Sequence, residues 1–178
     1  QDAGADAYNV AVGFDAGTSV TTGIHNTLIG AFAGDNLAGG GNNVAIGNYA
    51  LSTEDTHGRN VAVGYGALTT QDAGADAYSV AVGYLAGTNI TTGINNVLIG
   101  GLAGDNLSTG NYNIAIGKSA LTTEDAHGRN VAIGHNALFY LNAGADAYNI
   151  AIGYEAGVNV TTGVENVLIG GLAGDALT

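Results

Sequence analysis

The chain has 178 residues, of which 31 are glycine and none is proline, cysteine, methionine or tryptophan. Its formal net charge is −12 with only three basic residues, too few to neutralise a run of phosphates, which argues against nucleic-acid and anionic-lipid partners. A hydrophobic share of 46% is too high for a disordered chain, and no apolar run approaches the roughly 18 residues of a membrane-spanning helix.

A short motif, first seen as Asn-Val-Ala-Val-Gly at residues 9–13, recurs ten times along the chain. Successive motif glycines are 17, 17, 17 and 19 residues apart, and this series then begins again. Residues 1–70 and 71–140 are therefore two copies of a four-motif unit, and 141–178 is part of a third. A fixed period of this kind predicts a solenoid in which each repeat forms one coil, or rung. We expect one repeat domain over 1–178, a segment of a longer fibre.

Each motif is expected to form a short strand, because its residues alternate with a period of two and many are β-branched. In the first motif, alternation puts Val10 and Val12 on one face and the small residues of the motif on the other. We expect the aliphatic face to form a ladder inside the coil. The small-residue face allows close approach of another backbone, either the other wall of the same coil or a neighbouring chain.

Two motif positions are expected to form structural ladders along the stack. Stacking at about 4.8 Å lets equivalent Asn side chains hydrogen-bond from rung to rung, and ten rungs give a body about 48 Å long. The Asn ladder comprises Asn9, Asn26, Asn43, Asn60, Asn96, Asn113, Asn130, Asn149 and Asn166. The glycine ladder comprises Gly13, Gly30, Gly47, Gly64, Gly83, Gly100, Gly117, Gly134, Gly153 and Gly170.

A 17-residue period leaves room for further strands in each coil, and segments 18–24, 88–94 and 158–164 are the candidates. A helix would need an apolar stripe at 3.6-residue spacing, and none is present. The chain is therefore predicted to be all-β, a β-solenoid of ten rungs with 17–19 residues each.

The unit Asn-Val-Ala-Ile-Gly followed by two residues and Ala, as at 43–50 and 130–137, resembles the head repeat of YadA-like trimeric autotransporter adhesins. It is also similar to the Asn-Thr-Ala-Ile-Gly repeats of phage and marine-viral tail-fibre proteins. All ten rungs carry the pattern. The resemblance implies a left-handed parallel β-roll, three chains wound side by side, and a role in attachment.

Acidic residues in Gly/Ala turns are the candidate calcium ligands, because turn carbonyls can complete an oxygen shell. They are Asp2, Asp6, Asp72, Asp76 and Asp146. No segment matches a calcium-loop pattern, and position 142 is Asn. The competing interpretation is that these are solvated acidic turns, in which case the chain has no cofactor.

A second cluster joins Glu54, Asp55, His57 and Arg59, and returns at Glu124, Asp125, His127 and Arg129. One His per loop lacks the two- or three-His set typical of zinc, and a regular coil offers no pocket for acid–base chemistry. We therefore expect a surface ion pair of Arg59 with Glu54 or Asp55, and a chain that is not an enzyme.

Aromatic residues follow the motif glycines, and Tyr49, Tyr65, Tyr84 and Tyr154 are the candidates for surface contact. Their rings can stack on the sugars of a glycan, or they can cap the core or pack between chains.

These observations predict a structural and adhesive extracellular fibre segment, on a cell surface or a virion, that gives rigid length. The expected partners are further copies of the chain, as a homotrimer, and a host receptor, glycan or matrix. The alternative is a filament subunit that stacks end to end through uncapped rungs, since bare strand edges invite pairing.

Overall fold

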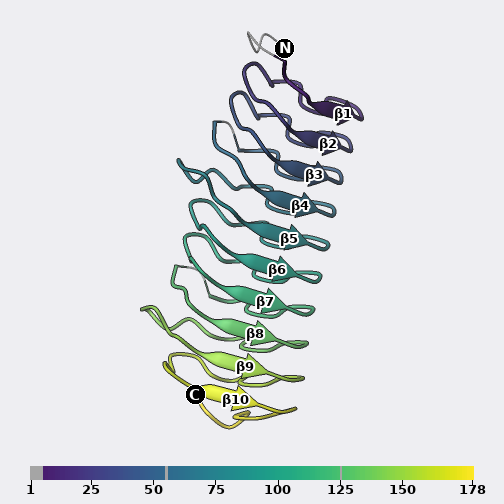
Figure 1. The fold of residues 1–178 in the computed structure, drawn as a ribbon. Helices are drawn as coiled ribbons and strands as arrows, with labels where there is room; N and C mark the ends of the chain where they lie inside the picture. Colours follow the sequence, from purple (N-terminus) through teal and green to yellow (C-terminus); the bar gives the residue numbers. More distant parts are fainter. Residues whose placement is uncertain (1–5, 55, 125) are drawn as a thin grey trace.

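The computed structural model shows one stack of coils, and it describes residues 6–54, 56–124 and 126–178 (Figure 1). Each rung contributes one three-residue strand, and the ten strands pair in chain order as a single parallel sheet. The strands are β1 (Val10–Val12), β2 (Thr27–Ile29), β3 (Val44–Ile46), β4 (Val61–Val63), β5 (Val80–Val82), β6 (Val97–Ile99), β7 (Ile114–Ile116), β8 (Val131–Ile133), β9 (Ile150–Ile152) and β10 (Val167–Ile169). The described residues include no helix that could cross a membrane. The predicted all-β solenoid is confirmed.

The register of the sheet never slips. Val10 lies opposite Thr27, and Val61 lies opposite Val80 although the connecting coil has 19 residues. The two longer coils, before β5 and β9, place their extra residues in loops that project from the stack (Figure 1). Because every rung keeps the same register, equivalent side chains form continuous rows along the molecule.

The expectation of further strands at 18–24, 88–94 and 158–164 was wrong. These segments follow turns, although their backbones still bond to the next rung, as where Thr21 N–H donates to the Ala38 carbonyl at 2.9 Å. The chain bends just after each strand, where Phe32 (φ 57°) and its equivalents adopt left-handed backbone conformations. Repeated bending of this kind leaves only three extended residues in each coil.

The orientation of the strands is the reverse of the expected one. The middle residue of each strand points into the coil, and Ala45 and Leu98 are fully buried. The first and third residues point outward, so Val10 and Val12, expected inside, are exposed. A narrow 17-residue coil has room for one Ala or Leu side chain per strand, and its β-branched residues remain outside.

One interior leucine changes position between rungs 2 and 3, and rung 2 buries a further leucine, Leu37. In rung 2 the leucine that changes position is Leu28, at the centre of the strand, and Gly34 follows in the turn; in rung 3 the strand has Ala45 and the turn has Leu51. A Cβ atom on Gly34 would lie 2.7 Å from a methyl of Leu28. Gly34 (φ 55°) and Leu51 (φ 51°) share one backbone conformation, so the two arrangements are alternative ways to fill the same space.

The glycine ladder marks where adjacent rungs come closest. Gly30 has φ +133°, and a Cβ there would lie 2.5 Å from the carbonyl oxygen of Gly47 in the next rung. No side chain fits in that gap, and L-residues rarely adopt that φ value. These two constraints explain why glycine ends the motif in every rung.

The motif Asn side chains form a ladder mainly to the backbone, and they also bond to one another where Asn130 donates to Asn113 and Asn166 donates to Asn149. Oδ1 of Asn43 accepts the N–H of Asn60 at 2.9 Å, and the same bond links rung to rung along the stack. Where Ser79 replaces Asn, its hydroxyl oxygen accepts the N–H of Asn96 at 3.4 Å. The side-chain amide of Asn96 also donates to the Gly110 carbonyl at 2.8 Å. This ladder satisfies buried backbone groups that the short strands leave unpaired.

Candidate functional site

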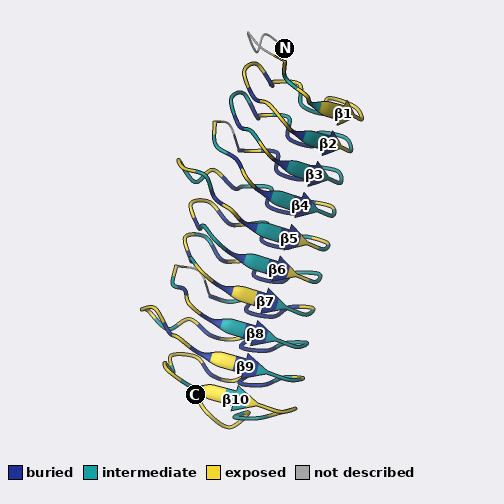
Figure 2. Cartoon of the chain, in the orientation of Figure 1, coloured by how far each residue is buried: buried dark blue, intermediate teal, exposed yellow. Residues whose placement is uncertain are grey.

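The most extensive feature of the surface is the outer side of the sheet. We call the first and third residues of the ten strands the Val/Ile face; all are Val or Ile except Thr27. Each of these residues is at least partly exposed, and the strands in Figure 2 are teal or yellow on this side. The most exposed members are Val10, Val12, Ile29, Val82, Ile99, Ile114, Ile150, Val167 and Ile169.

The Val/Ile face is as large as the largest apolar patch on a typical soluble monomer, and such patches are often functional. Ten strands at about 4.8 Å, each with three residues of about 3.3 Å, make a strip of about 500 Å². No charged or strongly polar side chain interrupts it. Apolar patches of this size are candidates for interaction surfaces in soluble proteins.

A row of aromatic side chains borders the Val/Ile face where the strands end. Successive rungs contribute Phe14, Phe32, Tyr49, Tyr65 and Tyr84, which we call the aromatic row. Neighbouring ring centroids lie 4.9–6.4 Å apart in alternating edge-on and stacked geometries. Three of the four predicted contact tyrosines therefore lie in one continuous row.

The fourth tyrosine lies apart from this row. Tyr154 stacks on His135 at 5.4 Å, near the C-terminal end of the stack. Between Tyr84 and His135, Leu102 and Ser119 take the equivalent positions. The sequence predicted the tyrosines individually; the spacings of 16 residues from Tyr49 to Tyr65 and 19 from Tyr65 to Tyr84, each close to one rung, were the signal that their rings stack.

The other border of the face carries the arginines. Arg59 pairs with Asp76 of the next coil and lies over the ring of Tyr78 at 5.6 Å. Arg129 pairs with Asp146 at 2.7 Å in the same way. Arg59 therefore pairs with Asp76 rather than with Glu54, one of its two expected partners; the other, Asp55, lies outside the described residues, as does Asp125.

The same aspartates also hold the projecting loops. Asp76 Oδ1 accepts the Gly58 N–H at 3.2 Å, and the hydrogen bond from Arg59 lowers the pKa of Asp76. The hydrogen bond from Arg129 lowers the pKa of Asp146 likewise. Each pair thus fastens a loop of the longer coil to the rung before it.

The candidate calcium ligands do not converge. Asp2 lies outside the described residues, and Asp6 accepts a hydrogen bond from the Tyr8 hydroxyl at 3.0 Å. Asp76 and Asp146 face arginines. Asp72 is separate from all of these and lies beside Glu54 and His57.

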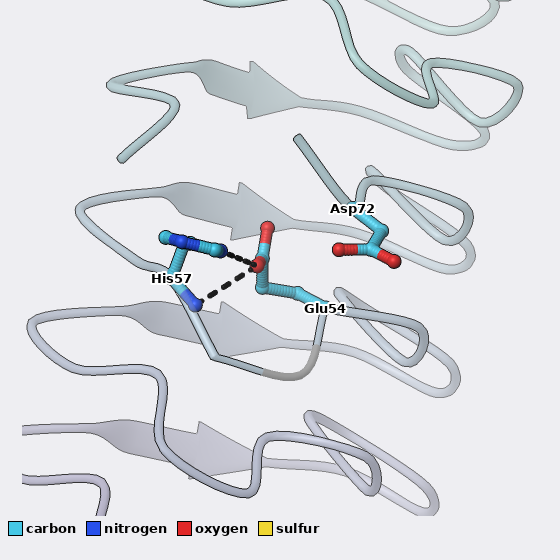
Figure 3. A group of neighbouring side chains, drawn as sticks. All are labelled: Glu54, His57 and Asp72. Atoms are coloured by element: carbon cyan, nitrogen blue, oxygen red, sulfur yellow. Dashed lines mark hydrogen bonds and ion pairs between the residues drawn. The ribbon is translucent and has the colours of Figure 1, made fainter. Parts of the chain in front are cut away.

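This last group is the one cluster of three metal-ligating side chains in the described residues. One donor atom from each of Glu54, His57 and Asp72 lies within 4.8 Å of the others (Figure 3). The sequence placed Glu54 and His57 together but assigned Asp72 to a different turn. The missed signal was the period, since Asp72 directly follows Gln71, the equivalent of Glu54 in the next rung.

The described part of the chain contains no pocket. Comparison with known proteins adds no identity: no family model, no curated protein and no solved structure matches this chain. The resemblance to adhesin and tail-fibre repeats therefore rests on the motif alone.

Proposed function

We propose that this chain is a segment of an extracellular structural and adhesive fibre, in which copies associate side by side through the Val/Ile face. The observation that carries the proposal is the continuous exposure of Val and Ile along ten strands. Burying this strip is favourable at about 25 cal/mol per Å². A second copy is the partner, because it presents the same strip with the same rung spacing over the whole length.

Charge supports self-association through this face. The net charge of −12 would oppose association of copies at random, but the ionisable side chains lie in turns and loops rather than on the strands. Association through the strands therefore brings apolar surfaces together without opposing carboxylates.

The area of the Val/Ile face indicates that neighbouring surfaces also contribute to the interface between copies. A stable interface buries about 800 Å² on each partner, more than the roughly 500 Å² of the Val/Ile face. The aromatic row and the tyrosines beside Arg59 and Arg129 border the face on its two sides and supply additional area. Three copies around a common axis bury all three strips and leave the turns exposed, which is the arrangement we propose.

Attachment is assigned to the parts of the aromatic row that remain accessible. Tyr65 and Tyr84 are about half exposed and stack at 5.5 Å. Flat, exposed rings in a row offer stacking faces for the sugars of a host glycan or matrix. The role proposed is thus mechanical and adhesive, not enzymatic.

Electron microscopy of the isolated protein tests this proposal. Class averages viewed along the stack should show three-fold symmetry and particles of one length. Single coils would contradict the proposal, whereas filaments of unlimited length would favour end-to-end stacking through the edges of β1 and β10.

A further inference from the structure

We infer that Glu54, His57 and Asp72 form a binding site for a transition-metal dication of the Zn²⁺ class. The three side chains come from adjacent rungs, and one donor atom of each lies within 4.8 Å of the others (Figure 3). Glu54 is fully buried, whereas His57 is partly exposed and Asp72 is exposed. An ion can therefore approach from solvent toward a carboxylate that is held inside the coil.

The carboxylate of Glu54 is positioned by its own turn. Its Oε1 accepts the backbone N–H of His57 at 3.2 Å and lies 3.9 Å from Nδ1 of the same residue. Nδ1 is also 3.1 Å from the Thr56 hydroxyl, which an arriving ion would displace. Asp72 is fixed from the other side, because its backbone N–H donates to the Thr91 carbonyl at 2.8 Å.

The kinds of ligand atom that Glu54, His57 and Asp72 offer indicate which metals the site would bind. One His alone falls short of the set typical of zinc, but Asp72 adds a second carboxylate to it, and an imidazole nitrogen with two carboxylate oxygens suits zinc, cobalt or nickel better than calcium, which takes six to eight oxygen ligands. Tetrahedral ligands at about 2.0–2.1 Å from the ion lie about 3.3 Å apart. The present separations reach that value by rotation of the accessible His57 and Asp72 side chains, while water fills the remaining position.

The equivalent residues 70 positions later, Glu124, His127 and Asn142, supply a natural comparison. Glu124 and His127 repeat the cradle, with Oε1 accepting the His127 N–H at 3.1 Å and lying 3.4 Å from Nδ1. Asn142 replaces the aspartate, yet its N–H makes the same bond, to the Thr161 carbonyl at 2.7 Å. The later cluster thus keeps the backbone hydrogen bonds of the first but has a neutral amide in place of one carboxylate. We therefore expect only the first cluster to bind a metal ion, one per chain.

Metal uptake by the full chain tests the inference directly. Zinc is titrated by calorimetry, and Co²⁺ is added as a spectroscopic probe whose absorption bands report imidazole and carboxylate ligation. The wild-type chain should bind one ion. Asp72→Asn, which copies Asn142 at the equivalent position, should weaken binding by at least about tenfold. Asn142→Asp should raise the stoichiometry to two ions per chain.

Circular dichroism of all three proteins serves as the folding control. A wild-type chain that takes up no zinc would overturn the inference, as would Asp72→Asn binding with wild-type affinity. Calcium added in place of zinc should give no comparable heat, and tight calcium binding would contradict the assignment of metal class.

Discussion

Ala45 and Ile46 are neighbours in β3, yet they lie on opposite sides of the coil wall: Ala45 is fully buried and Ile46 is partly exposed on the outer surface. The same relationship holds at the central and third positions of the other strands, except near the two ends of the stack, where burial decreases. Substitutions inside the wall should therefore change the stability of one chain, whereas substitutions outside it should change how chains associate.

Interior packing is tested by a double-mutant cycle at Leu28 and Gly34. Leu28→Ala should cost about 2–5 kcal/mol of unfolding free energy by leaving a cavity. Gly34→Leu alone should cost about 1–3 kcal/mol, because the new side chain meets Leu28. The double variant restores the Ala and Leu pair of rung 3 but keeps Leu37, whose methyl also lies 2.7 Å from the place of a Gly34 Cβ, so it should recover part of the summed single costs, about 1 kcal/mol. Additive losses in urea denaturation would refute this account of the interior.

The Asn ladder predicts a graded response at Asn96. Asn96→Ala leaves the N–H of Asn113 and the carbonyl of Gly110 without their side-chain partner, which should cost about 2–4 kcal/mol. Asn96→Ser should cost less, since Ser79 occupies the equivalent position in the neighbouring rung. Asn106→Ala, at an exposed turn, is the control and should change the free energy by no more than about 0.5 kcal/mol.

The glycine ladder predicts that the cost of replacing a glycine depends on the room for a Cβ atom as well as on a positive φ. Gly30→Ala should cost about 3 kcal/mol or more, because its Cβ would meet the Gly47 carbonyl and its φ is strained. Gly74 also has positive φ (+65°), but nothing lies within 4 Å of the place that a Cβ would take there, so Gly74→Ala should cost only about 1 kcal/mol. Equal thermal shifts for the two variants would contradict the close approach of rungs.

The pH dependence of stability should have opposite signs at two aspartates. Burial raises the pKa of Asp105, so its contribution to stability is present below its unfolded pKa and is lost as pH rises through the folded value. The Arg59 hydrogen bond lowers the pKa of Asp76, so that contribution is present above the unfolded pKa and is lost as pH falls through the folded value. At pH 7, Asp105→Asn should raise the Tm and Asp76→Asn should lower it. The Asp105 difference should fade as the pH falls to the unfolded carboxyl pKa of about 4, and the Asp76 difference only at lower pH, because its folded pKa is lowered. A pH-independent difference at either site would contradict the assignment.

The position of each strand was predictable because the period and the Asn-to-Gly motif define it locally. Which face of each strand points into the coil was not predictable, because alternation divides the side chains into two faces without showing which face is buried. The general burial of Val and Ile favoured the wrong choice. The sequence did contain evidence for which face is inside. Rung 2 has Leu at the strand centre and Gly in the turn, whereas rung 3 has Ala at the strand centre and Leu51 in the turn. A loss of volume at one position that is matched by a gain at the other is expected only where both side chains fill the interior.

The metal-ligating cluster was partly predictable for a related reason. Glu54 and His57 are close in sequence, but Asp72 joins them only through the stacking of one rung on the next. Arg59 likewise pairs with Asp76, one rung away, rather than with Glu54 of its own turn. In a solenoid, residues about 17 positions apart lie on adjacent rungs and contact one another. Closeness in sequence within one turn therefore predicts side-chain partners less well than this period does.

The central claim, association through the Val/Ile face, is tested most directly by the mass of the protein in solution, measured by light scattering after size-exclusion chromatography. The wild-type protein should have three times the 17.5 kDa mass of one chain. Val82→Lys/Ile99→Lys places two charges on paired positions of the face and should give a folded monomer. Thr92→Lys/Thr109→Lys adds the same charge at exposed turns and should remain trimeric. A monomeric wild-type protein, or trimers of the same mass for both variants, would contradict the account.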